Sequence, residues 1–141
     1  MAGRLKYSKR FHYPHMIDEE KLVWERFMDL YPDKFETVDY DFRVGEGVKI
    51  ESEPGTPWPR MAKMLSQKRI DVIGWVGDSP TIIEVKRRVG LSALGQIYGY
   101  RTLFIKGFAS FPTPKILVVC STISEDDRVV LEAAKVPIEV V

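Results

Sequence analysis

The sequence predicts an α/β protein with a mixed central sheet flanked by helices. Two observations lead to this class. Residues 69–75 and 81–86 are short apolar segments joined by a turn at 76–80, which is typical of a β-hairpin. A helical segment over 92–106 then separates the second hairpin strand from an apolar strand at 115–120, and a right-handed crossover between parallel strands needs such a connection.

Residues 1–16 combine basic and aromatic side chains, and we interpret them as an arm that precedes a single domain over 17–141. The arm would either stack on bases and pair with phosphates or form a partly ordered tail. His12 and His15 are assigned to this arm because their spacing is not that of a convincing metal-binding pair.

Asp18 is expected to cap a helix that continues to about Leu30 and stops at Pro32. The apolar stripe of this helix comprises Trp24, Phe27, Met28 and Tyr31. The alternation over 35–44 predicts a strand with apolar side chains on one face and polar ones on the other. The apolar set is Val38, Tyr40, Phe42 and Val44, and the polar set is Asp39, Asp41 and Arg43.

The rest of the chain follows from its prolines, caps and apolar runs. Several prolines predict an irregular loop over 51–60, and a short helix is expected over 61–67. Downstream of the hairpin and the strand at 115–120, a helix over 124–134 and a last strand over 137–141 are expected. The predicted order is α-β-β-β-α-β-α-β.

Composition indicates one globular domain: the chain has 141 residues, of which 45% are hydrophobic and 29% charged. Cys120 is the single cysteine and follows an apolar run, so we expect a buried thiol and a reducing compartment. No apolar stretch is long enough to span a membrane, and the N-terminus lacks the apolar core of a signal peptide. The expected location is the cytoplasm of a prokaryotic or viral host cell.

The net charge of +1 hides a segregation of charge along the sequence. Twelve of the twenty acids lie within 18–53, whereas 54–70 and 85–124 contain basic residues and no acid. Such blocks either form ordinary solvated surfaces or produce a positive face suited to a phosphate backbone.

The main candidate catalytic and metal-binding residues lie in the hairpin. Asp71 lies in the first apolar strand, and the second strand ends in Glu84-Val85-Lys86. Side chains alternate across a strand, so Glu84 and Lys86 share one face while Val85 points to the other. Two acids on neighbouring strands beside an amine are typical of a small Mg²⁺ site. A neighbouring lysine can orient water or stabilise charge that develops on a phosphate.

This pattern resembles the D…(D/E)-x-K signature of the PD-(D/E)xK nuclease superfamily, and Gln96 and Tyr100 match the Q-x-x-x-Y element of its RecB-like branch. The resemblance covers roughly residues 18–120, is closest to RecB-like and Holliday-junction-resolvase-like members, and departs from the signature at Ile70, where proline is usual. It implies a restriction-endonuclease-like α-β-β-β-α-β core, here with an added C-terminal α-β unit.

The resemblance also implies roles at the site. Asp71, Glu84 and the carbonyl of Val85 would hold Mg²⁺, for which Mn²⁺ should substitute, and Lys86 would position or deprotonate water or steady the phosphate. The simpler alternatives are an aspartate bonded to a turn and a Glu84–Lys86 surface pair of little energetic value.

Gln96 and Tyr100 share a helix face and would contact water and DNA near the site, although Tyr100 would also suit the core. Many members of the superfamily add a glutamate from the first helix. Glu20 is preferred because it shares the stripe of Trp24, with Glu25 and Glu19 as alternatives, and a helix-dipole role remains open.

Further basic residues are candidates for nucleic-acid binding, or else ordinary solvated side chains. Arg87 and Arg88 follow the site directly and would clamp a phosphodiester. The other candidates are Arg60, Lys63, Lys68, Arg69, Lys9 and Arg10.

The preferred function is a Mg²⁺-dependent nuclease that acts on DNA with ends, flaps or branches, in repair, recombination or the processing of phage or mobile-element DNA. A homodimer or a larger protein complex is compatible with it, and no membrane partner is expected. Two alternatives remain open: a non-catalytic nucleic-acid-binding subunit with the same fold, and an unrelated α/β protein.

Overall fold

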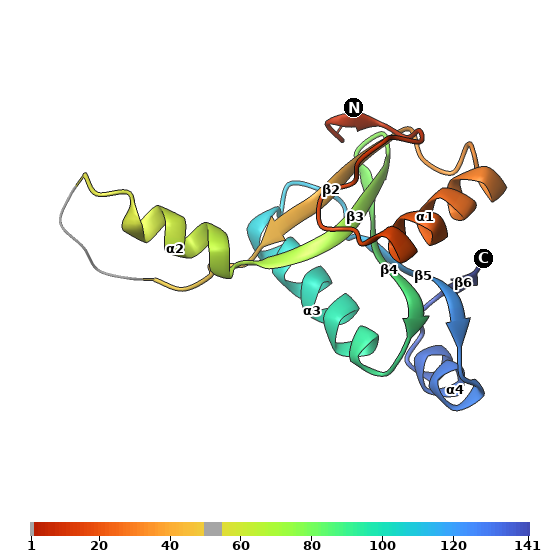
Figure 1. Cartoon of the computed structure of the whole chain (residues 1–141). Helices are drawn as coiled ribbons and strands as arrows, with labels where there is room; N and C mark the ends of the chain where they lie inside the picture. Colours follow the sequence, from red (N-terminus) through yellow and green to blue (C-terminus); the bar gives the residue numbers. More distant parts are fainter. Residues whose placement is uncertain (1, 50–54) are drawn as a thin grey trace.

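The computed structural model describes residues 2–49 and 55–141, which fold into a six-stranded sheet between helices (Figure 1). The elements are β1 (Leu5–Lys6), α1 (Asp18–Leu30), β2 (Thr37–Val44), α2 (Trp58–Ser66), β3 (Lys68–Val76), β4 (Ser79–Val89), α3 (Ser92–Gly107), β5 (Lys115–Ile123), α4 (Glu125–Ala133) and β6 (Ile138–Val140). Within the described ranges no helix is long and apolar enough to cross a membrane. The predicted loop over 51–60 lies partly outside the described residues.

The strands follow one another across the sheet in chain order. Strands β1 to β4 pair antiparallel, whereas β4–β5 and β5–β6 are parallel. This topology confirms the predicted α/β class and the order of its main elements; only β1 was not expected. The hairpin strands are longer than predicted, because Val76 pairs with Ser79 and leaves a two-residue turn in which Gly77 has φ +56°.

The core has two layers, one on each face of the sheet. Trp24 and Phe27 of α1 stack with ring centroids 5.2 Å apart and pack against Val85 and its neighbours. Ile97 and Phe104 of α3 pack on the opposite face. Burying side chains of this size contributes roughly 1.5–3 kcal/mol each, which explains why α1 and α3 settle on opposite faces. Cys120 is buried in β5 as expected, and burial raises the pKa of its thiol.

The N-terminal segment is packed against the domain. β1 pairs with β2, and Tyr7 and Tyr13 are buried among the residues of the α1 layer. The Tyr13 hydroxyl donates a hydrogen bond of 2.9 Å to Glu25. These two tyrosines are therefore not available to stack on bases, whereas Phe11 is fully exposed.

Two details of α1 differ from the prediction. Ile17, not Asp18, is the N-cap, because Asp18 already has helical geometry and the Glu20 carboxylate accepts the backbone N–H of Ile17 at 3.3 Å. Tyr31 lies past the helix end and is exposed, so it does not extend the buried stripe.

The predicted alternation of β2 is wrong at its midpoint. Val38 and Tyr40 pack in the α1 layer, but Phe42 and Val44 pack in the α3 layer. The cause is Asp41, whose φ of +51° reverses the alternation at that residue. Strand β3 changes faces at the same level, since Val72 belongs to the α1 layer and Ile70 to the α3 layer. Both strands therefore kink beside Asp71.

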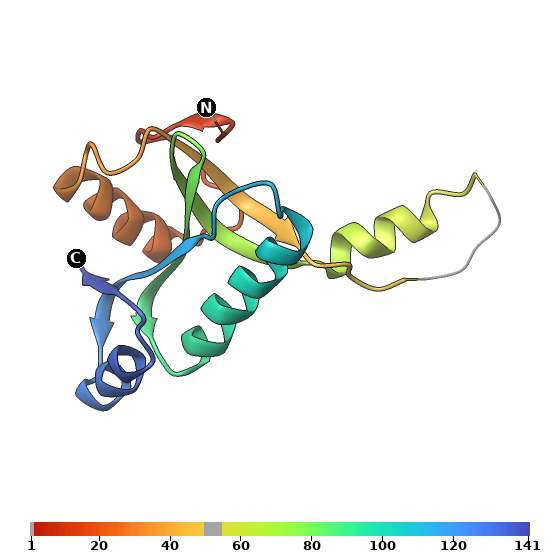
Figure 2. The same cartoon turned by 180° about the vertical axis from the view of Figure 1, so that it is seen from behind.

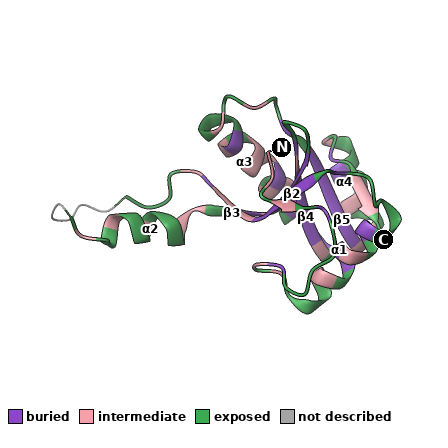
Figure 3. Cartoon of the chain, turned by 90° about the horizontal axis from the view of Figure 1, so that it is seen from above, coloured by how far each residue is buried: buried purple, intermediate pink, exposed green. Residues whose placement is uncertain are grey.

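Helix α2 projects away from the sheet at the end of β2 and β3 (Figures 1 and 2). It begins at Trp58, three residues before the predicted start, and none of its described residues is buried. The burial colouring shows the same contrast, with purple strands in the body and a largely green α2 (Figure 3). Its stability depends little on the core.

Candidate active site

The candidate site lies where β3 and β4 separate. The two strands pair from Val76–Ser79 as far as Val72–Ile83, and their ladder stops there. The next residue of β3 is Asp71, and its Oδ2 accepts the backbone N–H of Val85 at 2.9 Å. A side-chain carboxylate thus takes the place of a backbone acceptor. This fork brings the carboxylate of β3 beside the Glu84-Val85-Lys86 segment of β4.

Glu84 is the buried acid of the fork, with only 2% of its surface exposed. Its Oε2 has no hydrogen-bond partner among the described residues. Its Oε1 lies 3.6 Å from Nζ of Lys86. A buried carboxylate oxygen without a partner is unfavourable unless a cation or a donor approaches it. Glu84 is therefore suited to a positively charged ligand.

The acids of the fork hold their protons unusually tightly. Burial and, next, repulsion from Asp71 raise the pKa of Glu84 to about 8. Burial also raises the pKa of Asp71, against the opposing effects of the Val85 N–H and Lys86. Burial lowers the pKa of Lys86, but attraction to Glu84, Asp71 and Glu20 outweighs it, and the net shift is upward. The site therefore favours the charged form of Lys86, and it disfavours the state in which both acids are ionised.

Of the three glutamates of α1 considered from the sequence, Glu20 lies at the fork. Its Oε2 is 3.7 Å from Nζ of Lys86, so the lysine lies between Glu20 and Glu84. Glu19 instead pairs with Arg87 at 3.0 Å, and Glu25 accepts the Tyr13 hydroxyl. The sequence did not anticipate that Glu20 contacts the lysine.

Helix α3 brings Gln96 and Tyr100 to the same side of the sheet as Glu84. Together with Lys68 they line a cavity of about 310 Å³. Burial and the charges of Glu84 and Asp71 raise the pKa of Tyr100 to about 12. The tyrosine therefore interacts electrostatically with both acids, and its hydroxyl stays protonated near neutral pH.

Arg87 and Arg88 lie within β4, which continues past the predicted strand end at residue 86. Arg87 pairs with Glu19 of α1 at 3.0 Å, and Arg88 is exposed. Among the described residues no ion pair involves Arg88, so it is the arginine that is freer to contact a phosphate.

Of the remaining basic candidates, only Arg69 lies near the fork, two residues before Asp71 in β3. Arg60 and Lys63 belong to the projecting α2. Lys9 pairs with Asp29, and Arg10 donates its backbone N–H to the Tyr13 hydroxyl at 2.8 Å. Arg69 contacts His15 and lies 3.8 Å from Asp41.

Asp41 was predicted only as one of the polar residues on one face of β2, not as a residue of the site. It lies opposite Asp71, between the Tyr40–Val72 and Phe42–Ile70 pairs. Its Oδ2 is 3.1 Å from His15 Nε2, which ties the N-terminal segment to the kink. Because Asp39, Asp41 and Arg43 alternate along this strand, no sequence signal distinguishes Asp41 from its polar neighbours.

The donor atoms of the fork show whether it suits a metal ion. Among the residues described, no three His, Cys, Asp or Glu side chains are arranged to hold a metal. The fork instead offers two carboxylates, one with a buried free oxygen, next to the backbone of Val85. Mg²⁺ usually keeps several waters and needs only one or two carboxylates, so this donor set fits the ion.

Comparison with known proteins finds the fold of this chain in solved structures. No family model matches the sequence, and no curated protein matches it. Among solved structures, a repair endonuclease from Pyrococcus abyssi superimposes with a TM-score of 0.52 at 13% identity over 95% of this chain and 49% of the other. An EndoMS–dsDNA2 complex superimposes with a TM-score of 0.50 at 14% identity over 95% and 48%. The chain spans about half the length of these structures and shares their fold over that half.

Proposed function

We propose that the chain is a Mg²⁺-dependent nuclease that hydrolyses phosphodiester bonds of DNA. The observation that carries the proposal is the fork, where Asp71 and Glu84 meet beside Lys86 and a buried Glu84 oxygen lacks a partner. The shared fold with a repair endonuclease and with an EndoMS–dsDNA2 complex supports DNA as the substrate and repair as the setting.

Asp71 and Glu84 would hold the ion, with the carbonyl of Val85 as a third ligand. When bound, Mg²⁺ supplies positive charge that acidifies water and neutralises phosphate oxygens. Binding also offsets the burial that raises the pKa of both acids above their usual range. In its absence one of the acids retains a proton at neutral pH.

Lys86 has two roles in this proposal. Its ammonium stays charged because Glu20 and Glu84 flank it at 3.7 and 3.6 Å. A fixed cation beside the scissile phosphate stabilises the negative charge that develops there. Lys86 also holds water by donating hydrogen bonds. Glu20 acts through Lys86 and is therefore a positioning residue.

Tyr100, Gln96 and Lys68 would bind the DNA next to the fork. They line one cavity, and the Tyr100 hydroxyl remains a hydrogen-bond donor because its pKa is raised to about 12. Arg88 would add a charge-assisted contact from the exposed end of β4. DNA with ends, flaps or branches is the preferred substrate class within this proposal.

A cleavage assay tests the proposal. Purified protein is incubated with single-stranded, duplex, flapped and four-way-junction DNA, and with matched RNA, in Mg²⁺, Mn²⁺ or EDTA. Asp71→Asn should abolish cleavage, whereas Asp78→Asn, which alters an exposed acid in the turn of the same hairpin, should retain it. Metal-dependent binding without cleavage would favour a non-catalytic subunit. The absence of both DNA binding and DNA cleavage would refute the proposal.

A further inference from the structure

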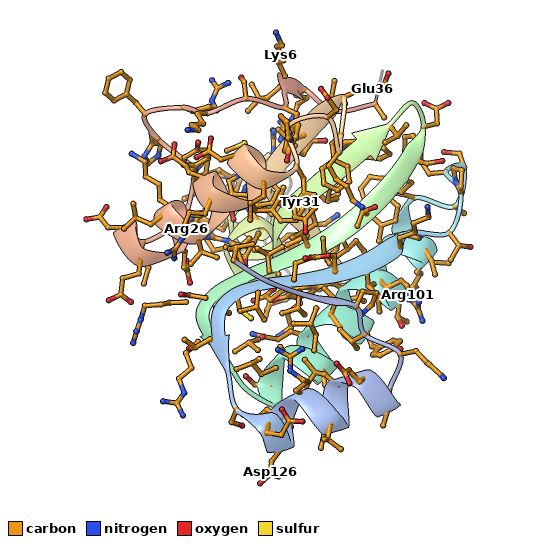
Figure 4. All side chains as sticks on the ribbon, turned by 90° about the vertical axis from the view of Figure 1, so that its right-hand side faces the viewer. Lys6, Arg26, Tyr31, Glu36, Arg101 and Asp126 are labelled. Carbon is orange, nitrogen blue, oxygen red and sulfur yellow. The ribbon has the colours of Figure 1, made fainter. Side chains whose placement is uncertain are left out.

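A second cavity, with basic side chains among its lining residues, lies at the other end of β4, away from the fork. Its volume is about 730 Å³, and we call it the basic cavity after its lining residues Lys34, Arg101, Lys115 and Lys135. Thr81 and Lys115, which pair across β4 and β5, form part of its wall. Thr81 precedes Glu84 by three residues, or about 10 Å of extended strand. Arg101, which belongs to α3 and lines this cavity, is labelled in Figure 4.

The basic cavity has no compensating negative charge. None of the described residues that line it is acidic, and none of its four cations forms an ion pair within 2–49 and 55–141. Elsewhere cations do find partners, as Arg4 does with Asp39 at 2.9 Å. Four like charges around one cavity repel one another, and a bound anion would relieve that repulsion.

Arg101 is held in place without neutralisation. Its guanidinium carbon lies 4.8 Å from the centroid of the Tyr98 ring. The Tyr98 hydroxyl donates a hydrogen bond to the carbonyl of Ala134, which fixes the ring between α3 and the end of α4. A guanidinium stacked on an aromatic ring keeps its N–H donors free at the edge, where they suit phosphate oxygens.

Lys135 occupies a backbone position where glycine is usual. Helix α4 ends with Lys135 N–H bonded to Glu132 and Val136 N–H bonded to Leu131, both at 3.0 Å. This is the Schellman arrangement, and Lys135 takes its left-handed position with φ +63°. A side chain is unfavourable in that conformation. Lys135 therefore places its charge beside the cavity at a conformational cost that glycine would avoid.

We propose that the basic cavity binds phosphate groups, supplied either by the DNA backbone or by a small phosphate compound. Unpaired cations from four separate segments converge on it, one of them at a position that would favour glycine. With DNA as the source, the cavity would contact a stretch of backbone remote from the fork. The proposal depends on the charges of the cavity alone and stands whether or not the fork cleaves DNA.

Two binding measurements on the full chain in EDTA test it. Fluorescence anisotropy with a labelled duplex is recorded over a series of salt concentrations, and calorimetry is run with pyrophosphate. The variants are Lys135→Gly, Lys115→Gln and their combination. Lys49→Gln is the matched control because Lys49 is an exposed lysine outside the cavity whose charge already pairs with Glu46.

If the backbone is the source, each variant should weaken duplex binding and reduce the slope of log affinity against log salt by about 0.9 per lost contact. The control should leave both unchanged. Lys135→Gly should unfold at the same temperature or up to about 2 °C higher, because glycine accepts the left-handed conformation. Weaker binding by this variant could then not be attributed to unfolding.

If only a small phosphate compound binds, pyrophosphate binding should be lost in the double variant while duplex binding is unchanged. Wild-type affinity for both probes in the double variant would overturn the proposal. A chain that never cleaves DNA but binds it through Lys115 and Lys135 would refute the nuclease function and leave the basic cavity supported.

Discussion

Glu84 should make the stability of the metal-free protein fall as pH rises. The perturbation is Glu84→Gln, which keeps the size of the side chain and removes its charge. The pKa of the Glu84 carboxyl is about 8 in the folded chain, against an ordinary value of 4.5. Folding therefore favours the protonated form. The stabilisation is fully present below pH 4.5 and is lost as pH rises through about 8.

The size of the effect follows from the two pKa values. Their difference corresponds to roughly 5 kcal/mol between low pH and pH well above 8. Roughly 3 kcal/mol of this is already lost at pH 7, because the unfolded chain has released its proton there and the folded chain has not. Total stabilities of single domains are about 5–15 kcal/mol, so the change is measurable. Asp71 adds to it in the same direction, since burial raises its pKa as well.

The assay is urea unfolding at several pH values between about 5 and 8. In EDTA the wild type should lose stability across this range. Glu84→Gln should lose less, with Asp71 contributing the remainder, and should exceed the wild type at the upper end. Mg²⁺ should restore the wild type, because an ion that binds only the folded state stabilises it. It should have little effect on Glu84→Gln.

Asp78→Asn is the control, since Asp78 is an exposed acid in the turn of the same hairpin. It should follow the wild type in EDTA and in Mg²⁺. Parallel pH curves for the wild type and Glu84→Gln would refute the idea that the buried carboxylate is poorly accommodated as an anion. Equal stabilisation of both by Mg²⁺ would refute its role in holding the ion.

Three further changes have defined outcomes. Lys86→Met should abolish cleavage and leave duplex binding within about threefold in anisotropy; retained cleavage would exclude the lysine from the mechanism. Gly74→Ala should cost about 1–3 kcal/mol in urea unfolding, because its new Cβ would lie 2.6 Å from the Phe35 ring, and an unchanged midpoint would contradict that packing. Ser124→Ala should cost about 1 kcal/mol, since Ser124 Oγ accepts the N–H of Asp127 at 3.2 Å and caps α4; a neutral result would show the cap to be dispensable.

The sequence pattern predicted most of the secondary structure for a local reason. Apolar periodicity, turn residues and caps act over a few positions, so α1, the hairpin, α3 and β5 could be located within a few residues. The Asp71 and Glu84-Val85-Lys86 spacing also marked the hairpin as the place where chemistry would concentrate. The burial of Tyr7 and Tyr13 could not be read from the sequence, because it depends on packing against α1 and β2.

By itself, then, the sequence determined the α/β class, the order of the main elements and the residues that make up the fork. Only the tertiary structure decided how they meet. It ends the β3–β4 ladder at Val72–Ile83 so that Asp71 bonds to Val85, and it places Glu20 beside Lys86. The kink at Asp41 and the convergence of distant cations on the basic cavity are decided at the same level. Each of these features depends on contacts between residues far apart in the chain, and local sequence patterns carry no information about such contacts.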